Sequence, residues 1–284
     1  MKKCLLLLLA TGMWIPLSAQ REYLPTPEDL EHFNRTKTYV VLNDNPMSDY
    51  NIEIQDAVKK YWDITEYEFL PFDEFGDRSA DENASVLYTS AVSFEKDRSR
   101  TRYTFLCLSL GGDYYSIDEM KDVANLPLGY YGVDEDRYSY KLGTMVRFLQ
   151  DHVRMITENP DMVSQNVYKH YNDNMGQVSG KTLYLVEDEL EHSVSTEARI
   201  KSVYPFKFQI VEPEDIKELI MEGDEDAVFL HKVGPEGSHM DSRVYKILIG
   251  AADGKFYYFD YHKSGRNPDA FLEKDFKKLA RANK

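Results

Sequence analysis

The chain has 284 residues and a formal net charge of −15, because its 49 acidic residues outnumber its 34 basic residues. Nucleic acids and anionic lipid surfaces bind clusters of lysine and arginine, so this acidity argues against both as partners. The length suffices for two domains of ordinary size, with cores large enough to fold without disulfide bonds.

The first twenty residues predict a secretory signal peptide. Two lysines precede an apolar run at residues 5–10, and Ser18 and Ala19 provide the small residues that are typical of a signal cleavage site. The run is much shorter than the roughly 20 apolar residues of a membrane-spanning helix. Cys4 lies at the wrong end of the signal to carry a lipid after cleavage. We therefore expect an exported soluble protein, periplasmic or secreted, without a membrane span and not a lipoprotein.

The first half of the chain has the pattern of an α/β domain, with strands predicted at about residues 36–44, 66–75 and 83–91. Ser48 is a suitable cap for a helix that continues to Trp62. Residues 102–116 predict a hairpin that turns at Gly111 and Gly112. The half ends in a helix whose apolar stripe is formed by Leu142, Met145, Val146, Leu149, Val153 and Ile156.

A tyrosine-rich stretch at about residues 118–140 separates this hairpin from the last helix and is interpreted as an insertion. It contains several carboxylates and the rings of Tyr130, Tyr131, Tyr138 and Tyr140. Aromatic faces beside carboxylates suit sugar stacking or a basic protein partner, so an exposed patch is one hypothesis. The alternative is that these rings pack the loop onto its own domain.

Residues 159–180 are polar and predict a linker between two halves of the chain. Gly176 and Gly180 resemble part of a phosphate-binding loop. Such a loop leaves a strand and opens a helix, whereas these glycines lead into a strand. The stretch therefore predicts a joint between domains.

The second half repeats the order of the first, with strands predicted at about residues 181–188, 207–216 and 226–234. Thr196 or Ser195 can cap the helix that follows the first of these strands. A hairpin turns at Asp253 and Gly254, and the last helix has a stripe of Leu272, Phe276 and Leu279.

The shared order predicts an α/β (α+β-like) fold of two tandem, diverged copies of a β-α-β-(α)-β-β-β-α unit with mixed sheets, at residues 21–158 and 181–284. Placing Lys37 on Lys181 aligns Asp44 with Asp188. The order resembles the thioredoxin fold, although the Cys-x-x-Cys motif is absent, and the α/β domain at the N-terminus of the translocation protein TolB. These resemblances concern the fold alone.

Asp44 and Asp188 are the first candidate ligand-binding residues. Each ends the first strand of its copy, and open α/β sheets collect ligands at the carboxyl ends of their strands. The alternative is that both residues only form the turn between strand and helix.

His231, His239 and His262 are the candidate metal ligands or acid–base groups. If the strand of His231 neighbours the strand of His262, their rings could converge on zinc or on a substrate. The alternative is a set of unrelated histidines at sheet edges. Cys107 is alone once Cys4 is removed, so no intrachain disulfide is expected, and its apolar neighbours predict a buried thiol.

These patterns support three hypotheses on function. The first is a non-catalytic binding or envelope-assembly protein with an unknown protein or glycan partner. The second is a hydrolase or metal-dependent enzyme centred on the histidines of the second copy. The third is carbohydrate binding through the tyrosines of the insertion. No cofactor motif is recognised.

Overall fold

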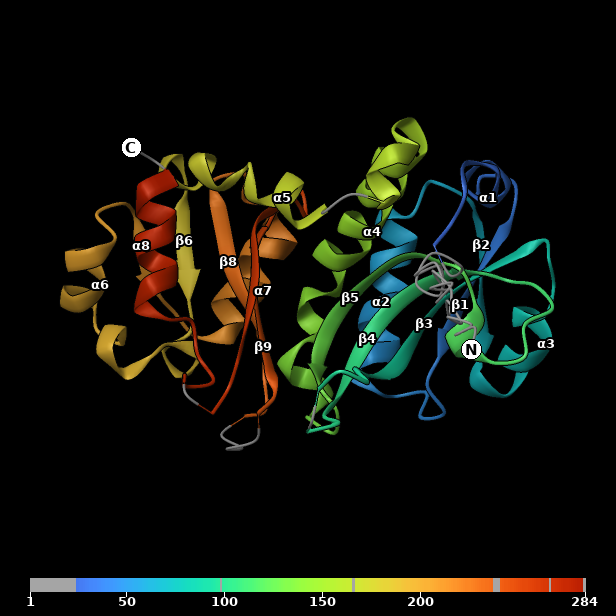
Figure 1. Cartoon of the computed structure of the whole chain (residues 1–284), viewed down its shortest axis with the longest axis horizontal. Helices are drawn as coiled ribbons and strands as arrows, with labels where there is room; N and C mark the ends of the chain where they lie inside the picture. Colours follow the sequence, from blue (N-terminus) through green and yellow to red (C-terminus); the bar gives the residue numbers. More distant parts are fainter. Residues whose placement is uncertain (1–23, 98, 165–166, 237–240, 266, 283–284) are drawn as a thin grey trace, which may run out of the picture.

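The computed structural model describes residues 24–97, 99–164, 167–236, 241–265 and 267–282. The chain forms two five-stranded mixed sheets that lie side by side (Figure 1). The predicted signal peptide at residues 1–20 lies outside the described residues. Within the described ranges, no helix combines the length and the apolar character needed to cross a membrane.

Among its described residues, the first repeat contains five strands and four helices. The strands are β1 (Lys37–Leu42), β2 (Glu66–Pro71), β3 (Ala84–Ser93), β4 (Arg102–Leu110) and β5 (Asp122–Tyr130). The helices are α1 (Pro27–Phe33), α2 (Asp49–Tyr61), α3 (Phe75–Ser79) and α4 (Leu142–Glu158). Short 3₁₀ turns are η1 (Phe72–Glu74), η2 (Ile117–Glu119), η3 (Glu135–Arg137) and η4 (Ser139–Lys141).

The connector contains η5 (Pro160–Ser164), α5 (Val167–Asn172) and η6 (Met175–Gly180). The second repeat has strands β6 (Thr182–Leu185), β7 (Phe208–Ile210), β8 (Ala227–Val233), β9 (Arg243–Gly250) and β10 (Phe256–Lys263). Its helices are α6 (Glu197–Val203), α7 (Pro213–Glu222) and α8 (Glu273–Ala282). Its 3₁₀ turns are η7 (Glu187–Glu189) and η8 (His192–Val194).

The two sheets have the same topology. The strand order is β2-β1-β3-β4-β5 in the first and β7-β6-β8-β9-β10 in the second. In each, the first three strands of the repeat are parallel and the last two are added antiparallel. This agreement confirms the prediction of an α/β fold built from two tandem, similar units.

Several local predictions are confirmed by their contacts. Ser48 caps α2, because its side chain accepts a hydrogen bond of 3.1 Å from the backbone of Asn51. Gly254 lies in the turn between β9 and β10 with a φ of +70°, a conformation that favours glycine. All six residues of the predicted stripe on α4 are buried.

The predicted hairpin of the first repeat is wrong in one respect. Its second strand is β5, inside the stretch interpreted as an insertion, and it pairs with β4 along most of its length. Gly111 and Gly112 do not form a two-residue turn, since their backbone amides donate to the carbonyls of Ala84 and Ser79. Pro127 weakens the strand pattern in the sequence, but it lies at a register shift in an edge strand, where proline is tolerated.

The pairing register also shifts the predicted alignment of the two repeats by one residue. Lys37 pairs with Ala84 in the first sheet, whereas Thr182 pairs with Ala227 in the second. Lys37 therefore corresponds to Thr182 and not to Lys181. A shift of one residue moves every side chain to the other face of a strand. Only in the observed register do corresponding residues of the two repeats lie on the face of the sheet that helices cover.

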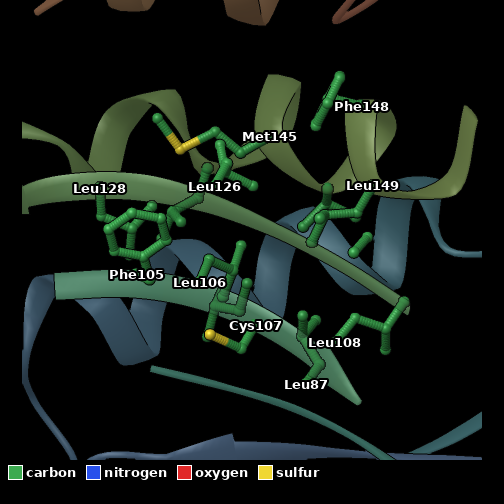
Figure 2. Packing of buried hydrophobic residues seen from close by; sticks show 14 of the residues in the cluster. Leu87, Phe105, Leu106, Cys107, Leu108, Leu126, Leu128, Met145, Phe148 and Leu149 are labelled. Carbon is green, nitrogen blue, oxygen red and sulfur yellow. The ribbon is translucent and has the colours of Figure 1, made fainter. Parts of the chain in front are cut away.

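Helices cover the corresponding face of each sheet. Leu126 on β5, with Met145 and Leu149 on α4, belongs to the buried layer between this helix and the first sheet (Figure 2). In the second repeat, α6 and α8 take the same positions, and Phe276 and Leu279 are fully buried there. The predicted stripe of the last helix is thereby confirmed.

The second sheet turns its other face toward the first repeat, so that α4 lies between the two sheets (Figure 1). Phe148 of α4 stacks on Phe256 of β10 with a centroid distance of 3.6 Å. Tyr103 of β4 accepts from the backbone N–H of Arg243 and donates to its carbonyl, at 2.6 and 3.0 Å. One hydrophobic cluster therefore extends across both repeats.

The connector packs on the second repeat. Tyr171 of α5 is buried, and Asn172 makes two hydrogen bonds to the backbone of Phe259 in β10. Asn174 adds a bond of 2.9 Å to the carbonyl of Phe256. These contacts hold residues 167–180 against an edge strand, where a polar linker was expected from the sequence.

Candidate functional site

A cavity of about 1120 Å³ lies between the two repeats. One wall is formed by the end of β5, by the turns that lead into α4 and by the start of α2. The other wall is formed by η7 after β6, by the start of α7 and by the segments that follow β8 and β10. Both walls contain the carboxyl ends of strands, where α/β sheets commonly hold ligands.

Carboxylates predominate among the charged residues that line this interdomain pocket. Three of them form ion pairs with basic residues of the lining: Glu236 with Arg137, Glu53 with Lys217 and Asp269 with Lys232. The carboxylates that form no ion pair with any described residue are Asp49, Asp136, Asp188, Glu189 and Glu214. The pocket therefore carries a surplus of negative charge, which attracts cations.

Glu189 is the most enclosed of these unpaired carboxylates. It ends η7, and its backbone is fixed by a bond of 3.1 Å to the carbonyl of Val186 and one of 2.7 Å from the amide of Phe271. Its Oε2 atom is buried and accepts no hydrogen bond from the described residues. Burial raises the pKa of Glu189, and the charges of Lys141 and Lys232 oppose this rise.

Lys141 lies behind the pocket wall as a buried cation. Only 1% of the residue is exposed, and it forms no ion pair among the residues that the structure describes. Its ammonium group lies 5.0 Å from the ring centroid of Tyr140. The charge of Lys141 therefore favours the ionised form of Glu189 through space, although the two side chains form no ion pair.

His231 is buried at the seam between the repeats. Its Nε2 atom donates a hydrogen bond of 2.9 Å to the carbonyl of Pro127 in β5, which leaves Nδ1 unprotonated in the neutral ring. Nδ1 has no hydrogen-bond partner among the described residues. Burial lowers the pKa of His231 to about 3, with a contribution from Lys141. His231 is thus a neutral structural contact between the two repeats.

The structure does not bring the predicted histidines together. His231 lies on the face of the second sheet that meets the first repeat, whereas His262 lies on the opposite face, near Lys246 and Asp275. His262 donates to the carbonyl of Pro268 at 2.9 Å. His239 lies outside the described residues. No cluster of three or more potential metal ligands occurs within the described ranges.

The two predicted aspartates have different surroundings. Asp188 is exposed and lines the interdomain pocket, while Asp44 is exposed and does not contribute to it. By the pairing register, Asp188 corresponds to Asn43, and Asp44 corresponds to Glu189. Asp188 therefore lies at the cavity, where the more enclosed carboxylate is that of its neighbour Glu189.

The predicted tyrosines do not form an exposed patch. Tyr138 is only 6% exposed, and Tyr130 and Tyr140 are partly buried against the core. Tyr131 is 45% exposed, and the guanidinium of Arg102 covers its ring at 4.0 Å from the centroid. Tyr130 and Tyr140 do line the interdomain pocket, so the stretch contributes to a cavity and not to an aromatic surface.

Glu189, Lys141 and Lys232 are not among the residues predicted from the sequence. Glu189 belongs to an acidic run directly after the first strand of the second repeat, and this signal could have identified it. Lys141 and Lys232 carry no comparable signal, because only the packing of one repeat against the other encloses them. Cys107 is buried as expected, and burial raises the pKa of its thiol.

The chain matches no protein-family model, no curated protein and no solved structure at the level required for a significant relationship.

Proposed function

We propose that the protein is an exported, non-catalytic binding protein whose interdomain pocket holds a positively charged segment of a partner. The observation that carries this proposal is the surplus of carboxylates: five of the lining acids have no ion pair among the described residues, whereas Arg137, Lys217 and Lys232 are each paired. Unpaired charge of one sign in a concave site attracts ligands of the opposite sign.

The other lining residues favour a peptide over a free metal ion or a small amine. Val133, Val186 and Pro213 are partly exposed and offer apolar surface to the alkyl stems of lysine or arginine, with Tyr130 and Tyr140 beside them. A drug-sized ligand fills roughly 300–1,000 Å³. The pocket of about 1120 Å³ therefore has room for several residues of an extended chain.

The proposal is tested by calorimetric titration of the mature protein with three blocked octapeptides that alternate alanine with lysine, serine or glutamate. We expect the lysine peptide to bind, the glutamate peptide not to bind, and the affinity for the lysine peptide to fall as salt is added. Equal affinity for the serine and lysine peptides would contradict the proposal. Binding of neutral oligosaccharides in place of all three peptides would favour the carbohydrate hypothesis.

Two variants of equal charge change locate the binding. The pocket variant D49N/D136N/E214Q is expected to lower the affinity for the lysine peptide by at least about tenfold, since each lost rim charge weakens the attraction. The control variant D44N/D73N/E74Q removes three exposed charges from outside the pocket lining. If both variants weaken binding equally, net charge alone is responsible and the pocket is not the site.

A further inference from the structure

Two exposed ion pairs join the two walls of the interdomain pocket. Glu53 of α2 in the first repeat pairs with Lys217 of α7 in the second repeat at 2.9 Å. Arg137 of η3 in the first repeat pairs with Glu236, which follows β8 in the second repeat, at 3.4 Å. All four residues line the pocket. Each pair therefore places a cation of one repeat on a carboxylate of the other, beside the cavity.

We propose that these two pairs form an exchangeable latch, in which the cations of a bound partner displace Lys217 and Arg137 and take their places on Glu53 and Glu236. The two glutamates are then the acceptors that give the pocket its preference for a lysine-bearing ligand. The inference rests on the proposed function and extends it from a surplus of charge to two named acceptors. The chain's own ammonium and guanidinium groups already occupy both carboxylates, so each of them accepts a cation.

Both carboxylates of the latch are accessible to a ligand. The Glu53 side chain is 28% exposed and that of Glu236 is 40% exposed. Exposed ion pairs add little to stability, so exchanging one for a pair with a ligand costs the fold little. The ion pairs of Asp97 with Arg243 and Lys263 also join the repeats, but this carboxylate is only 7% exposed and lies outside the pocket lining. The latch pairs are therefore the exchangeable ones.

The latch leaves part of the negative charge on α2 without a partner. Asp49 and Glu53 are four residues apart on this helix, so their side chains lie on one face, and both line the pocket. Glu53 raises the pKa of Lys217, and the charge of Asp49 adds to this rise. One ammonium group thus serves two carboxylates. A ligand with neighbouring lysines supplies a cation to each of them.

The backbone of Glu236 is held in place before a ligand arrives. Its φ is +49°, a left-handed conformation that residues other than glycine rarely adopt. Asp269 holds this turn, because its Oδ2 atom accepts the backbone N–H of Glu236 at 2.8 Å. Gly234 leaves room for Asp269, since a Cβ atom there would lie 1.8 Å from its Oδ1 atom. Asp269 is therefore a positioning residue, and a preorganised acceptor loses less conformational entropy on binding.

Cross-linking of the mature protein with a zero-length carbodiimide tests the exchange, because this reagent joins a carboxylate and an amine in contact as an amide. Free wild-type protein is expected to yield the Glu53–Lys217 amide, detected by mass spectrometry. The alternating lysine octapeptide, at about ten times its Kd, is expected to lower this yield at least about fivefold, since mass action then fills most sites. The peptide is also expected to become attached to Glu53 and Glu236.

The exposed pair of Glu197 and Lys201 within α6 is the internal control for this experiment. The yield of its amide is expected to stay constant when the lysine peptide is added, and the serine peptide is expected to change neither yield. Absence of the Glu53–Lys217 amide in free protein would overturn the latch.

Removal of the two latch cations is expected to tighten binding. In calorimetric titration, R137Q/K217Q is expected to bind the lysine peptide at least about threefold more tightly than wild type, since the ligand no longer competes with an exposed ion pair. The matched control R154Q/K201Q removes the same charge from exposed pairs within single repeats. It is expected to change the affinity by less than about twofold, because salt screens distant charges.

Removal of the two acceptors is expected to have the opposite effect. E53Q/E236Q is expected to weaken binding of the lysine peptide at least about tenfold, because it deletes both carboxylates and releases two cations at the pocket. D63N/E197Q is its matched control, since both residues belong to exposed pairs outside the pocket lining. If E53Q/E236Q binds as tightly as R137Q/K217Q, the pairs only obstruct the pocket and the glutamates are not its acceptors.

The outcomes separate the latch from the proposed function. If wild-type protein binds the lysine peptide but the yield of the Glu53–Lys217 amide does not change, the exchange is wrong while the binding function stands. If the lysine peptide binds neither wild-type protein nor R137Q/K217Q, both proposals fail.

Discussion

His231 joins the two repeats through an imidazole that must stay neutral. Its Nε2 donor satisfies the carbonyl of Pro127 in the first repeat, and the ring is 1% exposed. A protonated ring would place an unpaired charge in the apolar seam, close to the cation of Lys141. At the scale of one residue, the contact between the repeats is therefore sensitive to protons.

The substitution H231Q is predicted to flatten the acid dependence of stability. The pKa of His231 is about 3 in the folded protein against an ordinary value of 6.5. Between these values the unfolded chain binds more protons, so the free energy of unfolding falls with decreasing pH, by at most about 1.4 kcal/mol per unit from this residue. Urea unfolding of wild type and H231Q at pH 6.5, 5.5 and 4.5 measures the difference.

Glutamine keeps an N–H donor for the carbonyl of Pro127 but does not titrate. The variant therefore tests the effect of protonating residue 231 while it retains a donor for this hydrogen bond. The exposed His192 supplies the control H192Q, whose pH dependence is expected to match that of wild type. Parallel curves for wild type and H231Q would show that the seam does not respond to the protonation of His231.

The turn between β9 and β10 is an element whose backbone contacts the other repeat. A Cβ atom on Gly254 would lie 2.4 Å from the backbone carbonyl oxygen of Thr144 in α4 and 2.9 Å from the Cβ of Arg147. The hairpin thus needs glycine for two reasons, the φ of +70° and the approach of a helix from the first repeat.

The pair G254A and G223A separates these two reasons. Gly223, at the end of α7, has a φ of +69°, but a Cβ atom there meets nothing within 4 Å. G223A is expected to lower the free energy of unfolding by about 1 kcal/mol from backbone strain alone. G254A is expected to lower it by at least about 2 kcal/mol, because backbone atoms must move as well. If G254A and G223A lower the free energy of unfolding by the same amount in urea, the contact between the hairpin and α4 makes no additional contribution to the need for glycine at position 254.

The whole molecule has one core shared by two repeats. Phe148 belongs to the first repeat, yet it stacks on Phe256 of the second and lies in the cluster that spans both. Since small domains unfold cooperatively when their core is continuous, we expect both repeats to unfold in one transition.

The substitution F148A is predicted to lower the free energy of unfolding by about 3–5 kcal/mol and to shift both repeats together. Fluorescence of Trp62 reports on the first repeat, because the other tryptophan lies in the predicted signal. Hydrogen exchange of the amides in β9 reports on the second repeat. The exposed ring of Phe72 provides the control F72A, for which a loss below about 1 kcal/mol is expected. Separate midpoints for the two probes would contradict a common core.

The sequence by itself determined the order of elements and the duplication. Apolar periodicity fixes which residues of α4 face a core, and turn chemistry at Gly254 fixes a hairpin, because both signals are local. Strand β5 was missed because Pro127 interrupts its pattern and its pairing with β4 follows a long loop. The register of β6 was missed by one residue, because pairing partners are distant in the sequence.

The candidate site was decided by the tertiary structure. Asp188 could be placed at a strand end from the sequence. The surroundings of Glu189 could not, because the amide of Phe271 that binds its backbone and the charge of Lys141 that acts on it come from distant parts of the chain. His231 and His262 lie on opposite faces of the second sheet, and the order of strands along the sequence does not predict this. Periodicity and turns determine elements locally, whereas burial, charge pairing and cavities arise only where two repeats with one topology meet.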